Sequence, residues 1–494
     1  MSSEVIDGQY QCTPEPEVFV TRTERWVLAL TSTAALMVAL DQLVVATALN
    51  AIRDDLHTSL ATLDWTVNSY SLSFAVLLIT GAALGDRYGR RRMFVAGVAL
   101  FCLASAACAL APNTAVLIAA RTVQGAGSAL VTPLAVALLT AAFPVERRGP
   151  VVGIFTALTG LAVVGGPVVG GAVTQGIAWQ WIFWINIPIG VVLIPLALRR
   201  IGESRGERSR FDLRGLVLVS AGMFGIVWAL VRSDAAGWTS AEVLGALIGG
   251  VLAAAAFVLT ELRTPEPMLP MQLFAVRTYA AANAAMLMLT ASLFGAVFLF
   301  AQYLQISLGY DPLAAGLRFM PWTATLFVVA PLAGALNDRL GSRPLLVAGL
   351  ALQGIGLAWV AYNVDQGSPY SSSVVALVIA GCGTSMALPS SQNAVMNAVA
   401  PRYLGKASGT FNSVRQLGGV LGVAITSAVF AAHGSYAGPM AFQHGVGPAL
   451  FVAAGLAIVG AAAATLLEAR GRERTAVPEV ATTTTATVSA DVAA

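Results

Sequence analysis

Long apolar runs, each close to the length of a membrane-spanning helix, occupy most of this 494-residue chain. A helix needs about 20 apolar residues to cross the ~30 Å hydrocarbon core of a bilayer. Only 11% of the residues are charged, whereas a soluble domain averages roughly 25%. The chain is therefore predicted to be an all-α polytopic membrane protein. The fourteen expected spans are residues 26–49, 63–84, 93–111, 114–139, 149–173, 181–198, 212–232, 239–260, 278–303, 313–336, 344–363, 371–397, 405–432 and 445–468.

The distribution of Lys and Arg orients these spans. An even number of spans places both termini on one side of the membrane. If that side is the cytoplasm, only Arg53, Arg232 and Arg318 lie on the outer side. Arg121 and Arg415 lie within spans, and every other Lys and Arg is cytoplasmic or at a cytoplasmic span end. The positive-inside rule favours this arrangement, so we expect a multi-pass protein of the cell (inner or plasma) membrane with both termini in the cytoplasm.

The motifs of several other function classes are missing from the sequence. No G-x-x-x-x-G-K-[ST] phosphate-binding loop occurs, which argues against a pump that hydrolyses ATP itself. The four Cys and three His form neither a C-x-x-C pair nor an H-E-x-x-H arrangement, so no metal site is expected. The chain is predicted not to be an enzyme, to need no cofactor and to bind no nucleic acid.

One short segment occurs twice. Residues 82–91 (AALGDRYGRR) follow the second expected span, and residues 334–343 (GALNDRLGSR) follow the tenth. Both copies are expected in cytoplasmic loops, so they indicate a parallel repeat of six spans, with the seventh and eighth spans as an inserted pair. The expected regions are a cytoplasmic tail (1–25), an N-terminal six-helix bundle (26–198), a linker with two extra spans (199–277), a C-terminal six-helix bundle (278–468) and a disordered cytoplasmic tail (469–494).

The repeated turn has the chemistry of a gate. Its glycine permits a tight reversal, its aspartate can cap a helix N-terminus, and its arginines can pair with acids or lipid phosphates. Such a charge cluster could hold the two halves together in one conformation and release them in the other. The alternative is a basic loop that only sets topology. The candidate gating residues are Asp86, Arg87, Gly89, Arg90, Asp338, Arg339 and Gly341.

Ionisable residues inside spans are costly and mark candidate functional sites. Asp41 is the only acid deep inside an expected span, and Arg121 lies at a similar depth in the fourth span. Burial disfavours the charged form of a carboxyl group and a nearby cation favours it, so a carrier that alternates between two states would change both influences. Asp41 and Arg121 are therefore candidates for proton coupling, and the alternative is a purely structural ion pair. Gln124 shares the helix face of Arg121.

Other polar side chains within the spans are candidates for a substrate cavity, although amides are also common at span ends. Arg415 could bind a carbonyl group, Gln416 or the substrate, or it could extend towards the membrane surface. A mostly apolar cavity with one acid favours lipophilic, often cationic, substrates. The candidate cavity residues are Gln42, Gln124, Asn283, Gln302, Gln305, Asn393 and Arg415.

The expected span at 149–173 contains a proline flanked by four glycines, in Gly165–Gly171 (GGPVVGG). Close packing alone would explain the small residues, because glycines let another helix approach. The proline in addition predicts a bend. The residues assigned to this element are Gly166, Pro167, Gly170 and Gly171.

These motifs resemble those of the major facilitator superfamily. The turn at 86–91 (DRYGRR) is similar to its signature loop, and fourteen spans resemble its drug:proton antiporter branch. Residues 121–125 (RTVQG) look like its R-x-x-Q-G segment, which the resemblance connects with proton transfer. Residues 162–171 resemble its antiporter motif, with Ala162 in the first position, and in the superfamily this motif marks exporters.

Three further segments are similar to the same branch: residues 40–42 in the first span, the tryptophan-rich 179–188, and 415–419 (RQLGG). Two positions depart from the family pattern. Ala82 stands where the signature loop usually has Gly, and Gln180 stands where the branch commonly has Arg.

The resemblance implies a major facilitator fold of two six-helix bundles plus two inserted central helices. It also implies a proton-coupled antiporter that exports amphipathic drugs, antibiotics or toxic metabolites by alternating access, with the proton gradient as its energy source. Its partners would be protons, the lipid bilayer and a small-molecule amphipathic substrate, and a monomer is expected. An uptake symporter or facilitator for a small metabolite is the alternative on the same fold. A receptor or scaffold without transport is a third interpretation, which the buried acid disfavours.

Overall fold

The computed structural model describes residues 21–58, 60–205, 212–264, 267, 271–400 and 403–468. Helices make up nearly all of this part of the chain, and it contains no strand. The expected tails lie outside the described residues, apart from 21–25. The first helices are α1 (Arg22–Leu56), α2 (Leu60–Tyr88), α3 (Arg90–Ala109), α4 (Thr114–Ala142), α5 (Val145–Gly176), α6 (Trp181–Trp184), α7 (Asn186–Arg200), α8 (Leu213–Ala236) and α9 (Ala241–Arg263). They are followed by η1 (Met271–Ala275), α10 (Arg277–Ile306), α11 (Pro312–Leu317), α12 (Met320–Thr323), α13 (Thr325–Leu340), α14 (Ser342–Asp365), α15 (Tyr370–Asn397), α16 (Leu404–His433) and α17 (Pro439–Ala464).

Side-chain caps fix several helix ends. At the start of α1, Glu24 N donates to Thr21 Oγ1 at 3.2 Å and Thr21 N donates to Glu24 Oε2 at 2.7 Å, which is a capping box. The side chains of Asn113 and Asp311 accept from the first turns of α4 and α11. Such caps satisfy backbone donors that the helix itself leaves free, and each is worth ~1 kcal/mol.

Fewer helices pass a test of length and hydropathy for membrane spans than the sequence predicts. Among the described residues, 12 helices are long and apolar enough to cross a membrane, or up to 13 if the two parts of α2, which meet at 49°, form one span. Each of the fourteen expected spans falls on one helix or on a broken run of helices. The expected span at 149–173 coincides with α5, which has 32 residues and contains side chains that the structure does not describe. The count of fourteen stays a prediction.

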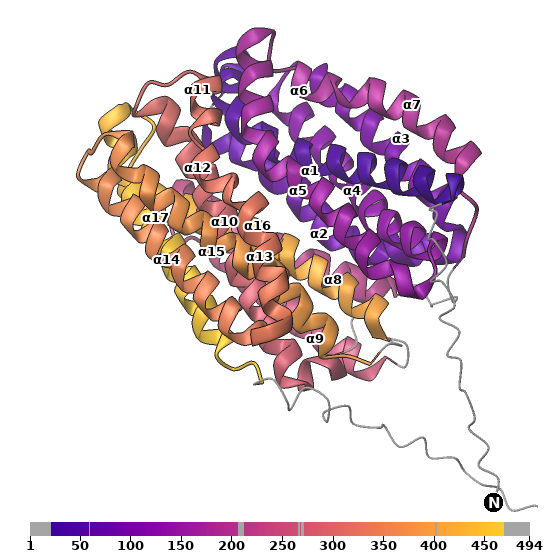
Figure 1. Cartoon of the computed structure of the whole chain (residues 1–494). Helices are drawn as coiled ribbons and strands as arrows, with labels where there is room; N and C mark the ends of the chain where they lie inside the picture. Colours follow the sequence, from indigo (N-terminus) through magenta and orange to yellow (C-terminus); the bar gives the residue numbers. More distant parts are fainter. Residues whose placement is uncertain are drawn as a thin grey trace, which may run out of the picture.

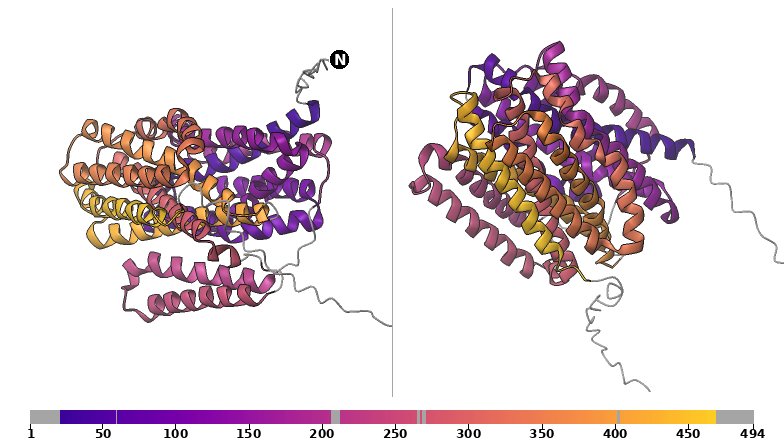
Figure 2. Two further views of the ribbon diagram at one scale, coloured as in Figure 1. Left: turned by 60° about the horizontal axis from the view of Figure 1, so that its bottom comes forward. Right: turned by 60° about the vertical axis from the view of Figure 1, so that its left-hand side comes forward.

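Two helical bundles lie side by side, one made of α1–α7 and the other of α10–α17 (Figure 1). In the first bundle α1 packs against α5 and α4; in the second α10 packs against α16 and α17. α8 and α9 form a hairpin beside the bundles (Figure 2). α8 packs against α2 of the first bundle and α16 of the second. The hairpin thus covers one seam between the bundles.

The hydrophobic cores show where the bundles meet. We call the end that carries residues 21 and 468 the proximal end and the opposite end the distal end. The distal core contains residues from both bundles, including the second half of α1 and the second half of α10. Among the described side chains the two proximal cores are separate, since one draws only on residues 27–201 and the other only on residues 273–467. The bundles are therefore joined at the distal end and diverge towards the proximal end.

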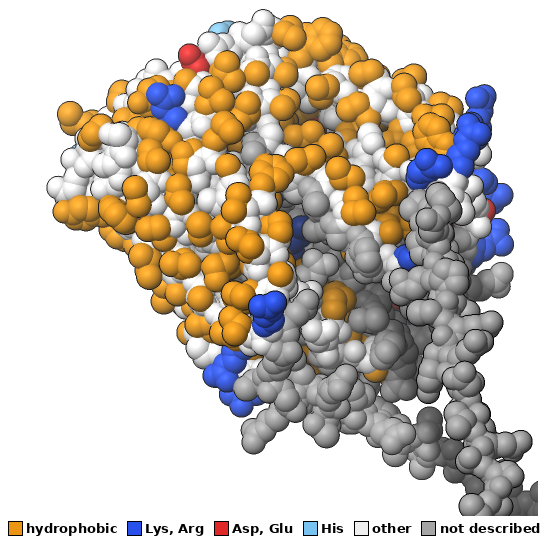
Figure 3. Space-filling view, viewed as in Figure 1, with side chains coloured by type: hydrophobic (Ala, Val, Ile, Leu, Met, Phe, Trp, Pro, Cys, Tyr) orange, Lys and Arg blue, Asp and Glu red, His pale blue; other side chains and the backbone are white. Residues whose placement is uncertain are grey.

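The surface agrees with this division. Figure 3 shows one face that is hydrophobic over most of both bundles. Most of the Lys and Arg side chains visible on this face lie near its edges. A second contact between the bundles is the seam beside α8, where Val227 packs with Leu72 and Val76 of α2 and with Val420 and Ala424 of α16. An apolar belt with charges at its margins is what a bilayer-embedded protein requires.

Candidate functional site

The centre of the N-terminal bundle holds a buried ion pair. Asp41 lies near the middle of α1 and Arg121 lies two turns into α4; both side chains are at most 1% exposed. Arg121 Nη1 donates to Asp41 Oδ2 at 2.5 Å. The two residues predicted to pair or compete at similar depth therefore form a direct pair, sealed from solvent in this conformation.

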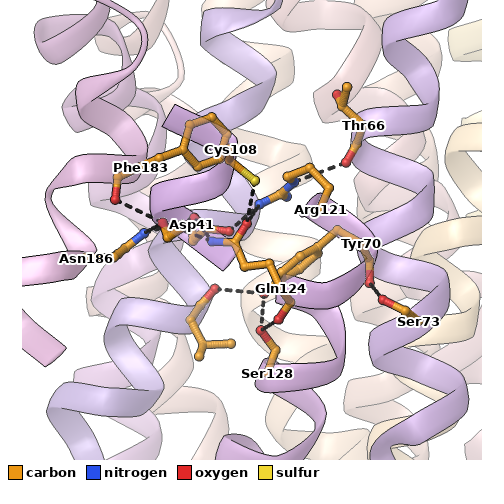
Figure 4. A network of polar contacts seen from close by, with 12 residues as sticks. Asp41, Thr66, Tyr70, Ser73, Cys108, Arg121, Gln124, Ser128, Phe183 and Asn186 are labelled. Atoms are coloured by element: carbon orange, nitrogen blue, oxygen red, sulfur yellow. Dashed lines mark hydrogen bonds and ion pairs between the residues drawn. The ribbon is translucent and has the colours of Figure 1, made fainter. Parts of the chain in front are cut away.

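Two amides complete the shell of the carboxylate. Gln124 Nε2 and Asn186 Nδ2 donate to Asp41 Oδ1 at 2.8 and 3.1 Å, and Gln124 Oε1 accepts from Arg121 Nη1 at 2.7 Å. Ser105 Oγ accepts from Asn186 at 2.9 Å and from Gln124 at 3.3 Å. Figure 4 shows Gln124 of α4 and Asn186 of α7 converging on Asp41. Each carboxylate oxygen therefore has at least one donor, as a buried charge requires.

Aromatic rings and a carbonyl group hold the guanidinium from its other sides. The ring centroid of Tyr70 lies 4.1 Å from Arg121 Cζ and that of Phe183 lies 5.6 Å away, within the range of cation–π attraction. Arg121 Nε donates to the carbonyl oxygen of Thr66 at 3.1 Å. The hydroxyls of Tyr70 and Ser128 are 2.8 Å apart. The cation is thus compensated by one carboxylate and oriented by α2 and α6.

The sequence predicted part of this network. Asp41, Arg121 and Gln124 come together as expected, and Asn186, Ser105 and Tyr70 were not singled out. An amide, a hydroxyl and a phenol inside apolar spans were the signal that could have found them, since lone polar groups in a membrane need partners. Gln42 is partly exposed and takes no part in the hydrogen bonds around Asp41.

The glycine–proline element of α5 forms two different helix contacts. Within the first bundle, a Cβ at Gly166 would meet Leu43 and a Cβ at Gly170 would meet Val44 and Thr47 of α1. α5 continues as one helix through Pro167. The glycines therefore allow the close approach of α1 that their size predicts.

The other side of this element touches the second bundle. A Cβ at Gly171 would meet the backbone of Pro312 and Leu313 of α11. From the other side, a Cβ at Gly316 of α11 would meet the carbonyl group of Pro167. The backbones of α5 and α11 are thus in contact at the distal end, and small residues on both helices permit it.

Hydrogen bonds reinforce the distal closure. Asn50 Nδ2 donates to Gln305 Oε1 at 3.2 Å, and Gln305 Nε2 donates to the carbonyl oxygen of Thr47 at 3.2 Å. Leu313 N donates to Gln175 Oε1 at 3.3 Å. Gln305 was predicted as a cavity residue; in this conformation it instead ties α10 to α1 across the closed end.

The remaining expected cavity residues differ in their surroundings. Asn283 and Gln302 are buried (2% and 0% exposed), and each donates to a carbonyl group of its own helix, at Tyr279 and Phe298. They therefore do not line an open surface here, because neighbouring helices cover them. Asn393 and Arg415 are partly exposed.

The first copy of the repeated turn pairs within its own bundle. Asp86 Oδ1 accepts from Arg90 Nε at 2.7 Å, and the N-cap of α3 is Gly89, without a side-chain cap. The expectation that Asp86 caps a helix is therefore wrong: the carboxylate is engaged by an arginine one turn away. Arg87 stacks on Tyr88, with 5.4 Å between its Cζ and the ring centroid.

Glu203, beyond α7, holds the same turn from the other side. Its Oε1 accepts from Arg91 N at 3.0 Å, and its carboxylate forms ion pairs with Arg91 and Arg92 at 3.7 Å. Gly89 has φ 110°, in the region that favours glycine. Gly341, in the second copy, has φ 83°, so both copies make the same glycine-dependent reversal. Arg339 is exposed, and the side chain of Asp338 lies outside the described residues.

We expect Gly89→Ala to destabilise the turn and slow transport. A methyl group at φ 110° is strained, and it would lie against the Glu203 carboxylate. The cost is about 1–3 kcal/mol, visible as a lower midpoint of thermal unfolding in detergent. The matched control is Gly202→Ala in the adjoining loop, where no atom lies within 4 Å of an added Cβ. Equal stability of the two variants would contradict this role of Gly89.

The architecture defines a class: a multi-pass membrane transporter of two bundles that are closed at one end and diverge at the other. The family comparison names it. The model of the Major Facilitator Superfamily matches residues 31–423 and, in a second match, 283–489. The chain therefore belongs to the major facilitator superfamily, whose members are transporters rather than enzymes.

Similar proteins and structures agree with this assignment. The chain is 35% identical to the multidrug resistance protein Stp of Mycobacterium tuberculosis (strain CDC 1551 / Oshkosh), over 84% of this chain and 77% of that protein. It is 34% identical to the tetracenomycin C resistance and export protein of Streptomyces glaucescens, over 82% and 75%. It is 33% identical to the methylenomycin A resistance protein of Streptomyces coelicolor (strain ATCC BAA-471 / A3(2) / M145), over 90% and 93%. A D-xylose-proton symporter structure shares the fold, with TM-score 0.63, 14% identity and coverage of 92% and 98%.

Proposed function

We propose that this transporter exports small amphipathic molecules, including drugs, antibiotics or toxic metabolites, in exchange for protons. The names of its relatives, which include multidrug resistance and antibiotic export proteins, support the export of such molecules. The observation that carries proton coupling is the sealed Asp41–Arg121 pair with its amide shell. A carboxylate enclosed at this depth is costly and is retained where it serves transport.

The conformation fits one half of an alternating-access cycle. We place both termini in the cytoplasm, as the skew of the Lys and Arg residues favours. The bundles then diverge towards the cytoplasm and are closed towards the outside. A cytosolic molecule would enter between them, and separation of α5 from α11 would release it outside. In this state Asp41 is paired with Arg121, as expected after its proton has left to the cytoplasm.

Helix α1 connects the proton site to the closure. Within two turns it carries Asp41, then Leu43 and Val44 against the glycines of α5, then the Thr47 carbonyl group that accepts from Gln305 of the other bundle. Protonation of Asp41 would neutralise the partner of Arg121 and weaken the contacts that fix α1. Any rotation or shift of α1 would act directly on the distal contacts between the bundles. This short path is the proposed coupling between proton entry and opening to the outside.

Transport in inverted membrane vesicles tests the function. With an acidic lumen, vesicles that contain the protein should take up a fluorescent amphipathic dye, and a protonophore should collapse that uptake. Vesicles without the protein give the background. Drug susceptibility of an efflux-deficient host that expresses the chain would then define the substrate range. Accumulation of the dye by intact cells, in place of depletion, would establish the uptake alternative.

A further inference from the structure

The two arginines inside the expected spans have opposite surroundings. Arg121 is neutralised by Asp41 and held by Gln124 and the Thr66 carbonyl group. Arg415, on α16, forms neither an ion pair nor a hydrogen bond with any residue that the structure describes. Its Nε is fully enclosed and lacks an acceptor, while the side chain as a whole is partly exposed. The C-terminal bundle therefore presents a cation without a counter-charge.

Arg415 lies where the two bundles diverge. It is eleven residues from the proximal end of α16, or about 16 Å at the helical rise, too deep for its side chain to reach the membrane surface directly. Phe411, one turn nearer the proximal end, belongs to the separate core of the second bundle, and Val423 belongs to the distal core shared by both bundles. Along α16, Arg415 is thus placed between these two cores, at the level where the bundles separate.

None of the acids that the structure describes forms an ion pair with Arg415. Asp41 is engaged by three donors of its own bundle, and Asp86, at the proximal end of α2, is paired with Arg90. α10 and α17, which pack against α16, contain no Asp or Glu. Gln416, the next residue of α16, also has a buried Nε2 without an acceptor. This turn of α16 therefore carries buried donors on Arg415 and Gln416 that have no acceptor in the described part of the chain.

We infer that Arg415 binds the anionic group of a transported molecule, so that the substrates include amphipathic acids with a carboxylate or phenolate. A guanidinium offers two parallel N–H donors that match a carboxylate, and the attraction is stronger where water is excluded. The inference rests on the proposed export function and changes its expected chemistry. The acid that favoured cationic substrates is already neutralised, and the charge left free in the structure is positive.

Binding of two dyes with the same xanthene ring system tests the inference. The purified protein is placed in nanodiscs of phosphatidylcholine, and fluorescein (anionic) and rhodamine 6G (cationic) are titrated by fluorescence anisotropy. Arg415→Gln should weaken fluorescein binding by about tenfold or more and leave rhodamine 6G binding unchanged or tighter. Arg415→Lys should retain part of the fluorescein affinity. Arg263→Gln, which removes an exposed positive charge at the end of α9, should behave as the unaltered protein.

Thermal unfolding separates this role from a structural one. Because an unpaired buried charge costs stability, Arg415→Gln should unfold at the same temperature as the unaltered protein or higher. Equal fluorescein affinity in Arg415→Gln, or a clear loss of its thermal stability, would overturn the inference. Loss of fluorescein binding when phosphatidylglycerol is added would assign the site to a lipid phosphate and overturn it as well. Selective fluorescein binding without any vesicle transport would contradict the export function and would still support the anion site.

Discussion

Asp41→Asn is expected to abolish pH-gradient-driven export and to lower the stability of the protein. The substitution keeps the shape of the side chain but removes the charge that compensates Arg121. It also replaces one accepting oxygen by an NH2 group, which cannot accept from the three donors that now surround the carboxylate. Removing one partner of a buried pair costs about 3–5 kcal/mol. Gradient-driven dye uptake by inverted vesicles should fall to the background of vesicles without the protein, and the midpoint of thermal unfolding should fall with it.

The double variant Asp41→Asn/Arg121→Gln separates coupling from stability. It removes both charges, so no unpaired ion remains in the bundle, and stability should recover by most of the amount lost in the single variant. Gradient-driven transport should stay at background, because no group remains that can carry the proton at this site. A double variant with both stability and gradient-driven transport restored would show that the pair is structural only.

The pairing of Asp41 with Arg121 could be predicted because the cost of burying charge leaves few choices. One acid and one base at similar depth in the same half, each too deep to reach water, are expected to meet. The amide shell could not be predicted in the same way. Asn186 and Gln124 are neutral, and an amide can instead donate to a backbone carbonyl group of its own helix, as Asn283 and Gln302 do. Which amide reaches a carboxylate depends on the rotation of each helix, and hydropathy does not encode that rotation.

The glycines of α5 also show that the sequence does not predict which neighbouring helix each face of a helix will contact. Their spacing predicts a face suited to close approach, and the structure has that face. Gly166 and Gly170 lie against α1, whereas Gly171, about 100° further round the helix, lies against α11 of the other bundle. The sequence holds no signal for which neighbour meets which face. The break between α11 and α13 was not predicted either, although Arg318 and Pro321 interrupt the apolar run there.

The gating role of the repeated turn stays a prediction, and its contacts differ from those expected. Asp86 was expected to cap a helix, and the nearby Arg90 engages it instead, since a charged donor one turn away binds a carboxylate more strongly than a backbone amide does. Which residues oppose the turn depends on the conformation. With the bundles apart at the proximal end, Glu203 of the same half is its partner.

Gly171→Val is expected to prevent closure of the distal end and to abolish transport. The added side chain would collide with the backbone of Pro312 and Leu313, and backbone cannot give way as a flexible side chain does. Overpacking usually costs about 1–3 kcal/mol. Here the two surfaces belong to separate bundles, so moving the bundles apart relieves the collision without unfolding either of them. The population should therefore shift towards the conformation that is open at the distal end.

Cross-linking of Asn50→Cys to Gln305→Cys by a short bifunctional thiol reagent measures this shift. The two native side chains are joined by a hydrogen bond across the closed end, and the reagent spans the length that the shorter cysteine side chains leave open. The pair should cross-link readily in a background without the native cysteines, and Gly171→Val should suppress the cross-link and the gradient-driven dye uptake together. The matched control is Gly176→Val on the same helix, where an added Cβ meets nothing within 4 Å, and it should leave both unchanged. Undiminished cross-linking in Gly171→Val would mean that the α5–α11 contact does not control closure. Suppressed cross-linking with normal transport would mean that this closure is not a step of the cycle.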